Sequence, residues 1–299
     1  MFIKNEKLKG AAFMVSACAM FGVMASLVKL VSHIDAFMIG LWRFVIGMAL
    51  VAAAAFSGII QLRFNNRRLL LVRGLLGGAG IVMTYFAIIK LGMSKGMVLV
   101  STYPIFACIF SVILLKEKPS VVSSIAIAAA FAGIFLVAGG NNGAAGIFEN
   151  FGFYEILAVC VGLIGGIVIV AIRKLHQTDN SYSIYFSQCA VGFLIAIVPA
   201  SRGFSRVGLT DGLILVLIGI TATIGQLMMT QSYKYLPVRI GATLAMLEPV
   251  FCYIGGVALF GEFVSAKSVI GTLLIIGSCV AVVLHGYRSQ QSGLQSVGG

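Results

Sequence analysis

The residues best suited to chemistry are a glutamate and a tyrosine that each stand directly before a proline. Glu248 precedes Pro249, and Tyr103 precedes Pro104, 145 positions earlier in the chain. Proline lacks an N–H and clashes with the preceding helical turn, so each site frees a backbone carbonyl. A carboxylate beside a loosened backbone suits an amine ligand or a transferable proton, and a phenol suits a small amphiphilic solute. We predict that both residues bind substrate; the alternative for Glu248 is a structural acid paired with a neighbouring helix.

Other polar side chains lie inside apolar segments, where they are costly and therefore candidates for function. Arg43 follows Trp42, and its guanidinium could bind a substrate carboxylate bidentately or pair with Glu248 as a structural strut. We assign Arg43 a structural or gating role. The remaining predicted substrate-binding residues are Tyr85, Gln226, Gln231 and Tyr253.

Two acidic residues recur at the ends of apolar segments, each three residues before a serine. Glu117 lies in KEKPS and Glu262 in GEFVS. An acid at this position can cap the next helix N-terminus or bind basic groups of a neighbouring loop. We therefore predict structural or gating roles for Glu117 and Glu262, and likewise for Pro104 and Pro249.

The sequence predicts no metal site and no cofactor. Its three histidines are scattered, and its six cysteines show no CxxC spacing and no neighbouring histidine. We interpret the cysteines as small apolar side chains within helices.

The elements that must position these residues are membrane-spanning helices. The chain is 60% hydrophobic and only 10% charged, too little polar surface for a soluble globule of 299 residues. A spanning helix needs ~20 apolar residues. About ten such runs are present, at 10–31, 36–57, 70–90, 96–115, 121–139, 152–172, 182–199, 210–231, 240–260 and 267–285. The predicted fold class is an all-α integral membrane protein with about ten transmembrane helices.

The second half of the chain is a diverged copy of the first. An offset of 145 positions superimposes Pro104 on Pro249 and Glu117 on Glu262 without a gap. Five helices per copy bring the second copy into the membrane from the opposite side, which predicts two inverted five-helix repeats. The predicted domains are a first repeat at 1–139, a linker at 140–151, a second repeat at 152–285 and a disordered cytoplasmic tail at 286–299.

The net charge of +12 does not indicate nucleic-acid binding, because the basic residues lie at helix ends instead of forming one basic surface. With the N-terminus inside, fourteen basic residues, Arg73 among them, fall on the inner side and six on the outer side. Because inner loops are rich in Lys and Arg, we predict that both termini are cytoplasmic.

These features resemble the drug/metabolite transporter superfamily, in its EamA-type branch. The resemblance rests on Arg43-Phe44 in the second run, and on the proline, glutamate and serine at 104, 117 and 120 that recur at 249, 262 and 265. It implies a bacterial-type inner (plasma) membrane carrier with a cavity lined by helices one, three, four, six, eight and nine, so helix two would not line it. Many members carry a tryptophan in helix one, where this chain has Met20-Phe21-Gly22.

The leading hypothesis is a secondary transporter, not an enzyme. It would move a small polar or amphiphilic metabolite, such as an amino acid, nucleoside or vitamin-like compound, through the lipid bilayer by alternating access, in the export direction. Proton coupling through Glu248 is part of this hypothesis. The alternatives are an integral-membrane enzyme and a passive channel.

Overall fold

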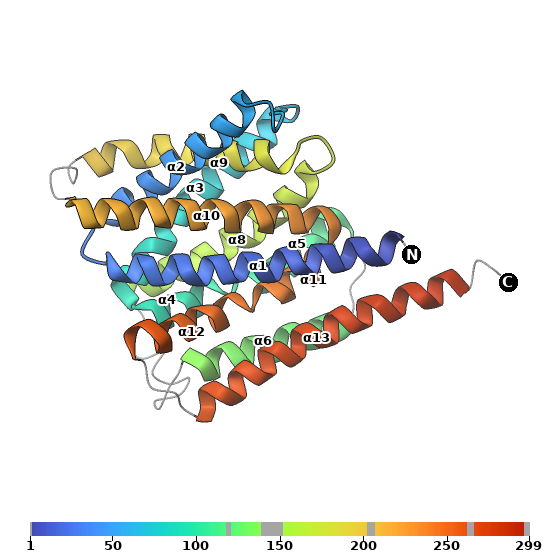
Figure 1. Cartoon of the computed structure of the whole chain (residues 1–299). Helices are drawn as coiled ribbons and strands as arrows, with labels where there is room; N and C mark the ends of the chain where they lie inside the picture. The colour runs from blue at the N-terminus through green and yellow to red at the C-terminus, as the bar shows by residue number, and fades with distance from the viewer. Residues whose placement is uncertain (1, 118–120, 139–151, 202–206, 262–265, 296–299) are drawn as a thin grey trace.

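The fold is a bundle of helices (Figure 1). The computed structural model describes residues 2–117, 121–138, 152–201, 207–261 and 266–295. The helices in chain order are α1 (Phe2–Leu30), α2 (Ala36–Phe56), α3 (Arg67–Leu91), α4 (Met93–Val100), α5 (Tyr103–Leu115), α6 (Val121–Ala138), α8 (Phe153–Leu175), α9 (Ser181–Ala200), α10 (Leu209–Tyr235), α11 (Val238–Ala245), α12 (Glu248–Phe260) and α13 (Ala266–Gln295).

The lengths and surfaces of these helices are those of a membrane protein. Among the described residues, seven helical segments are long and apolar enough to cross a bilayer, and three shorter apolar helices accompany them. Large apolar side chains such as Leu114, Leu194 and Leu273 are more than half exposed on the outside of the bundle. Water would disfavour such a surface, whereas lipid solvates it. The predicted all-α membrane class is confirmed.

Side-chain caps fix where several helices begin. The Asp35 carboxylate accepts from Phe37 N before α2, and the Asn180 amide oxygen accepts from Ser183 N before α9. Such caps satisfy N–H groups that have no partner within the helix. Asp35 and Asn180 are 145 positions apart, so the repeat extends to the capping residues.

The fourth and ninth predicted helices are each broken in two, which corrects the continuous helices predicted at 96–115 and 240–260. The first becomes α4 and α5, and the second becomes α11 and α12. Pro104 and Pro249 stand in the first turn of the later helix, where the missing N–H costs nothing. The breaks obey the same offset, since α11 and α12 lie 145 positions beyond α4 and α5 at both ends.

Packing between helices follows the same correspondence. α1 packs against α10 and α12, and its counterpart α8 packs against α3 and α5. α6 and α13 pack against each other at one edge of the bundle (Figure 1). The sequence halves are therefore interleaved in space, and helices of both halves surround the centre.

Small residues allow the closest of these contacts. A Cβ added at Gly78 in α3 would lie 2.8 Å from the Cα of Gly192 in α9, backbone against backbone. Close approach at small residues supplies the packing that holds helices together in lipid. α3 and α9 therefore meet through glycine.

One difference from the prediction concerns the C-terminal end of the chain. α13 continues to Gln295, whereas the sequence predicts disorder from 286. Extending an existing helix requires no new nucleus, which favours this continuation. The predicted linker at 140–151 and Glu262 lie outside the residues that the structure describes.

Candidate functional site

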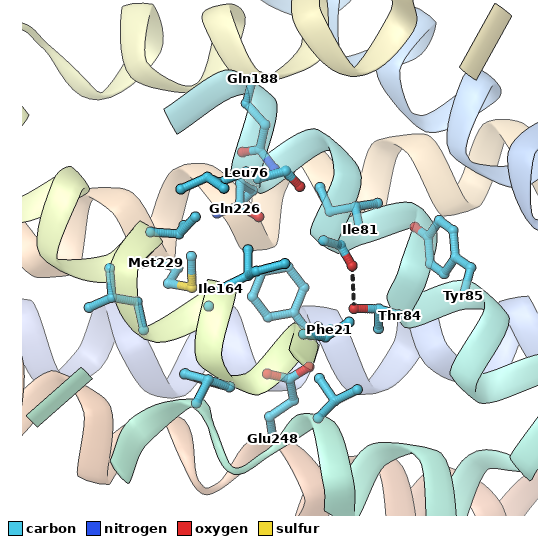
Figure 2. Close-up of a pocket in the computed structure, with 18 of the residues that line it drawn as sticks. Phe21, Leu76, Ile81, Thr84, Tyr85, Ile164, Gln188, Gln226, Met229 and Glu248 are labelled. Carbon is cyan, nitrogen blue, oxygen red and sulfur yellow. Dashed lines mark hydrogen bonds between the residues drawn. The ribbon is translucent and has the colours of Figure 1, made fainter. Parts of the chain in front are cut away.

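A cavity lies at the centre of the bundle, between the two halves (Figure 2). Its volume is about 150 Å³, room for roughly five water molecules at ~30 Å³ each. Most of its lining is apolar, including Phe21 of α1, Ile164 of α8 and Met229 of α10. The polar lining residues are Arg43, Arg73, Thr84, Tyr85, Tyr103, Gln188, Gln226 and Glu248. A mostly apolar wall with a few polar groups is typical of a small-molecule site.

Four of the six residues predicted to bind substrate line this cavity: Tyr85, Tyr103, Gln226 and Glu248. The other two lie elsewhere. Gln231 accepts from Ser181 Oγ and donates to Tyr235 Oη, near the end of α10. Tyr253 is half-buried and packs against the apolar core. The structure thus brings together residues from α3, α5, α10 and α12.

Glu248 begins α12 instead of lying in the body of a helix, which corrects the sequence interpretation. A helix N-terminus favours negative charge, because its free N–H groups and dipole point towards that charge. The Glu248 carboxylate points into the cavity from one wall, and Gln188 lies on the opposite wall (Figure 2). Within the described part of the chain, the Glu248 carboxylate forms no hydrogen bond and no ion pair.

The carbonyls at the helix break are partly satisfied by a cysteine. Cys18 Sγ of α1 donates weakly to the carbonyl oxygens of Leu244 and Ala245, at 3.7 and 3.8 Å. The thiol is a weak donor and fits where a larger polar group would not. This cysteine is therefore more than the apolar side chain predicted from the sequence.

Arg43 lies in the cavity wall, although helix two was not expected to line it. The side chain is 4% exposed. Its Nη1 donates to Tyr85 Oη at 3.0 Å, and its Nη2 donates to Gln226 Oε1 at 3.2 Å. These contacts hold α2 to α3 of the same half and to α10 of the other half. The arrangement agrees with a positioning role, and Arg43 also faces the site.

Arg73 is the cavity residue that the sequence analysis missed, because it was counted among the inner-side charges. It is 1% exposed and lies in α3, where Nη2 donates to Gln188 Oε1 of α9 at 2.7 Å. The Asn66 side chain caps α3 by accepting from Leu69 N, so the helix begins at Arg67 and carries Arg73 into the bundle. Asn66 was the residue in the sequence that could have shown where α3 begins. Phe21, which stands in the Met20-Phe21-Gly22 segment of α1, also lines the cavity and was not among the predicted site residues.

Glu117 lies away from the central cavity, at one end of the bundle. Its Oε1 accepts from Val238 N at 3.1 Å, so it caps α11 of the other half. Arg173, His176 and Lys234 share a separate pocket with it. Pro104 and Pro249 lie at the helix breaks described above. No group of three or more His, Cys, Asp or Glu side chains gathers as a metal site in the described segments.

Comparison with known proteins agrees with this geometry. The EamA-like transporter family matches residues 8–139 and again 152–284. The chain is 25% identical to the pseudopaline exporter CntI of Pseudomonas aeruginosa, over 91% of this chain and 95% of that protein. It is 23% identical to solute carrier family 35 member G1 of Mus musculus, over 92% and 78% respectively. A crystal structure superimposes with a TM-score of 0.79 at 17% identity, covering 93% of this chain and 98% of that one. The chain belongs to the EamA-like transporter family.

Proposed function

We propose that this protein is a secondary carrier that exports a small polar or amphiphilic metabolite across a bacterial-type inner membrane. The observation that carries the proposal is the central cavity, which both sequence halves line and which is apolar apart from a few polar side chains. The exporter activity named for the Pseudomonas relative supports the direction. Amino acids, nucleosides and vitamin-like compounds are candidate solute classes, because they combine polar groups with apolar parts as this lining does.

The mechanism we propose is alternating access between two inverted five-helix repeats. The matching breaks in α4–α5 and α11–α12 support it, because broken helices around a central site are typical of carriers built from inverted repeats. In this scheme one repeat rocks against the other and exposes the cavity to each side in turn. Both termini lie in the cytoplasm.

We also propose that Glu248 carries the coupling proton. Its carboxylate faces the cavity and lacks a protein partner among the described residues, so protonation and substrate binding can compete for it. An intramembrane carboxylate in a water-accessible cavity is a common proton-carrying group.

Counterflow in proteoliposomes tests the carrier. Candidate solutes are first selected from amino acids, nucleosides and vitamins by their ability to raise the unfolding temperature of the detergent-solubilised protein. We expect saturable exchange of labelled for unlabelled solute. Flux that rises linearly with concentration and shows no counterflow would instead indicate a channel, and a chemically altered product would indicate an enzyme.

Glu248→Gln tests the coupling. We expect it to retain counterflow, which needs no proton, and to lose accumulation driven by a pH gradient. Glu6→Gln removes an acid from the exposed start of α1 and is the matched control. Retention of gradient-driven accumulation in Glu248→Gln would refute the proton role.

A further inference from the structure

Arg73 is buried in the cavity wall with most of its hydrogen-bonding capacity unused. A guanidinium carries five N–H groups. One of them, on Nη2, donates to Gln188 Oε1 at 2.7 Å. Nε and Nη1 have no hydrogen-bond partner among the described residues, although the side chain is only 1% exposed. Unpaired buried N–H groups on a charged side chain are costly, so a ligand that accepts from them would be bound strongly.

Arg43 differs from Arg73 in this respect. Its two terminal nitrogens donate to Tyr85, Gln226 and the sulfur of Met24, and only Nε is left without a partner. Arg43 is therefore held in place by the protein itself. Arg73 is the arginine with unpartnered donors, and because both nitrogens are fully buried, a solute reaches them when the guanidinium turns towards the cavity.

The charges in the cavity are also unbalanced. Two arginines and one glutamate line it, and neither arginine forms an ion pair within the described part of the chain. A single negative charge on a bound solute would balance the set. Carboxylate is the anion whose two oxygens match a planar guanidinium edge.

Gly77 leaves the space that the Arg73 guanidinium occupies. It lies one turn after Arg73 in α3, and a Cβ added there would overlap Arg73 Nη1 and approach Gln188 Cδ to 3.3 Å. Replacing Gly77 by a larger residue would therefore shift the end of the Arg73 side chain from this position beside Gln188. Gly77 and Arg73 together shape this part of the cavity wall.

We propose that Arg73 anchors a carboxylate subsite in the central cavity, so that the transported solute is a small carboxylic acid. Glu248, on the facing wall, then receives a neutral hydrogen-bond-donating end of the same solute. This inference rests on the proposed carrier function and narrows its substrate class.

Binding of benzoate and benzamide tests the subsite. The two probes have the same shape and differ in charge, and benzene-sized ligands fit engineered cavities of about 150 Å³. We expect millimolar benzoate to raise the unfolding temperature of the detergent-solubilised protein and benzamide to have little effect. Equal effects of both probes, or no effect of benzoate, would overturn the carboxylate subsite.

Substitutions in α3 test whether benzoate binds at Arg73. Arg73→Gln should weaken benzoate binding roughly tenfold or more, because it removes a charge-assisted bond. Arg73→Lys keeps the charge but lacks the planar fork, and Gly77→Ala displaces the guanidinium, so both should weaken it too. Arg68→Gln makes the same charge change at an exposed position of α3 and is the control. An undiminished benzoate response in Arg73→Gln would refute the assignment.

The stability of the unliganded variants separates a ligand-binding role from a structural one. If Arg73 serves the solute, Arg73→Gln removes an uncompensated buried charge and should leave the unfolding temperature unchanged or raise it. A fall of several degrees would mark Arg73 as a structural strut. Saturable counterflow of a neutral or cationic solute, without any carboxylate preference, would overturn this inference while leaving the proposed carrier intact.

Discussion

At the scale of single residues, several side chains act across the boundary between the two halves. Glu117, at the end of α5, caps α11 of the other half through Val238 N. Its second oxygen, Oε2, is buried without a hydrogen-bond partner in the described segments. Because this cap depends on one carboxylate oxygen of Glu117, loss of the negative charge should cost less stability than loss of the hydrogen-bond acceptor.

Glu117→Ala should therefore destabilise the protein by about 0.5–2 kcal/mol, the usual range for removal of an N-terminal cap. Glu117→Gln keeps an acceptor of the same length and should retain most of that stability. The measurement is the urea or thermal unfolding of both variants in detergent. Equal losses in the two variants would show that the charge, and not the cap, is what matters.

His176 gives the protein a pH dependence at the same end of the bundle. Burial lowers the pKa of His176 from its ordinary value of 6.5, and the charges of Arg173 and Lys234 lower it further, while the bond from Nε2 to Thr230 O opposes the change. As the pH falls, the unfolded state takes up the proton first. The contribution of neutral His176 to stability is therefore full above pH 6.5 and is lost as the pH falls through the lower folded-state pKa.

His176→Gln should flatten the dependence of the unfolding temperature on pH below 6.5. The slope that one proton can contribute is at most about 1.4 kcal/mol per pH unit. His33→Gln, at an exposed histidine, is the control. An acid slope that is the same in His176→Gln as in the parent would contradict this account.

The kinds of chemical group in the site were easier to predict from the sequence than the full set of residues that line it. Glu248 and Tyr103 were identified because they precede prolines at equivalent positions. Arg73 was missed because the apolar run begins at 70, which made the arginine look like part of a helix end. The cap at Asn66 starts the helix at Arg67, so Arg73 lies two turns inside it, and hydropathy alone does not register a cap.

At the scale of elements, the close approach of α3 and α9 is the most demanding contact. Gly78 and Gly192 meet backbone to backbone, without a flexible side chain that could move aside. Any added atom there must separate the two helices, and the Arg73–Gln188 bond spans the same pair.

Gly78→Ala should accordingly destabilise the protein by about 1–3 kcal/mol, the range for overpacking. The matched control is Gly277→Ala in α13, where an added Cβ meets nothing within 4 Å. The control should be neutral or slightly stabilising, because alanine favours helix over glycine. Unfolding temperatures of both variants measure the difference, and a neutral Gly78→Ala would mean that α3 and α9 separate easily.

The helix breaks show why element boundaries were predicted only in part. Each apolar run was identified, and its proline was noted. The turns at 101–102 and 246–247 contain no glycine and no charge, so nothing in their composition interrupts the run. The interruption comes from the later helix starting at its proline, which only the backbone geometry reveals.

At the scale of the whole molecule, the first turns of α1 and the last turns of α13 lie towards the same end of the bundle (Figure 1). Near that end lie Arg63 and Lys116 in loops and Arg173 and Lys234 in the last turns of α8 and α10, whereas Lys29 and Lys90 lie in the last turns of α1 and α3 at the opposite end. From the positive-inside rule we predict that the first end faces the cytoplasm.

Cysteine labelling checks this topology. In a cysteine-free background, His33→Cys between α1 and α2 should react with a membrane-impermeant maleimide on intact cells. Gln61→Cys between α2 and α3 should react only after permeabilisation. The opposite pattern would invert the proposed orientation and the positions of both termini.

The bond between Arg73 and Gln188 has a consequence for how the chain is made. The two residues are 115 positions apart, and a ribosome adding about 5–20 residues per second needs roughly 6 to 23 s to cover that distance. During this interval the newly made α3 carries a guanidinium for which no amide partner has yet been synthesised. We expect α3 to wait at the translocon or the headgroup region until α9 emerges, so that the final placement of an early helix is timed by a late one.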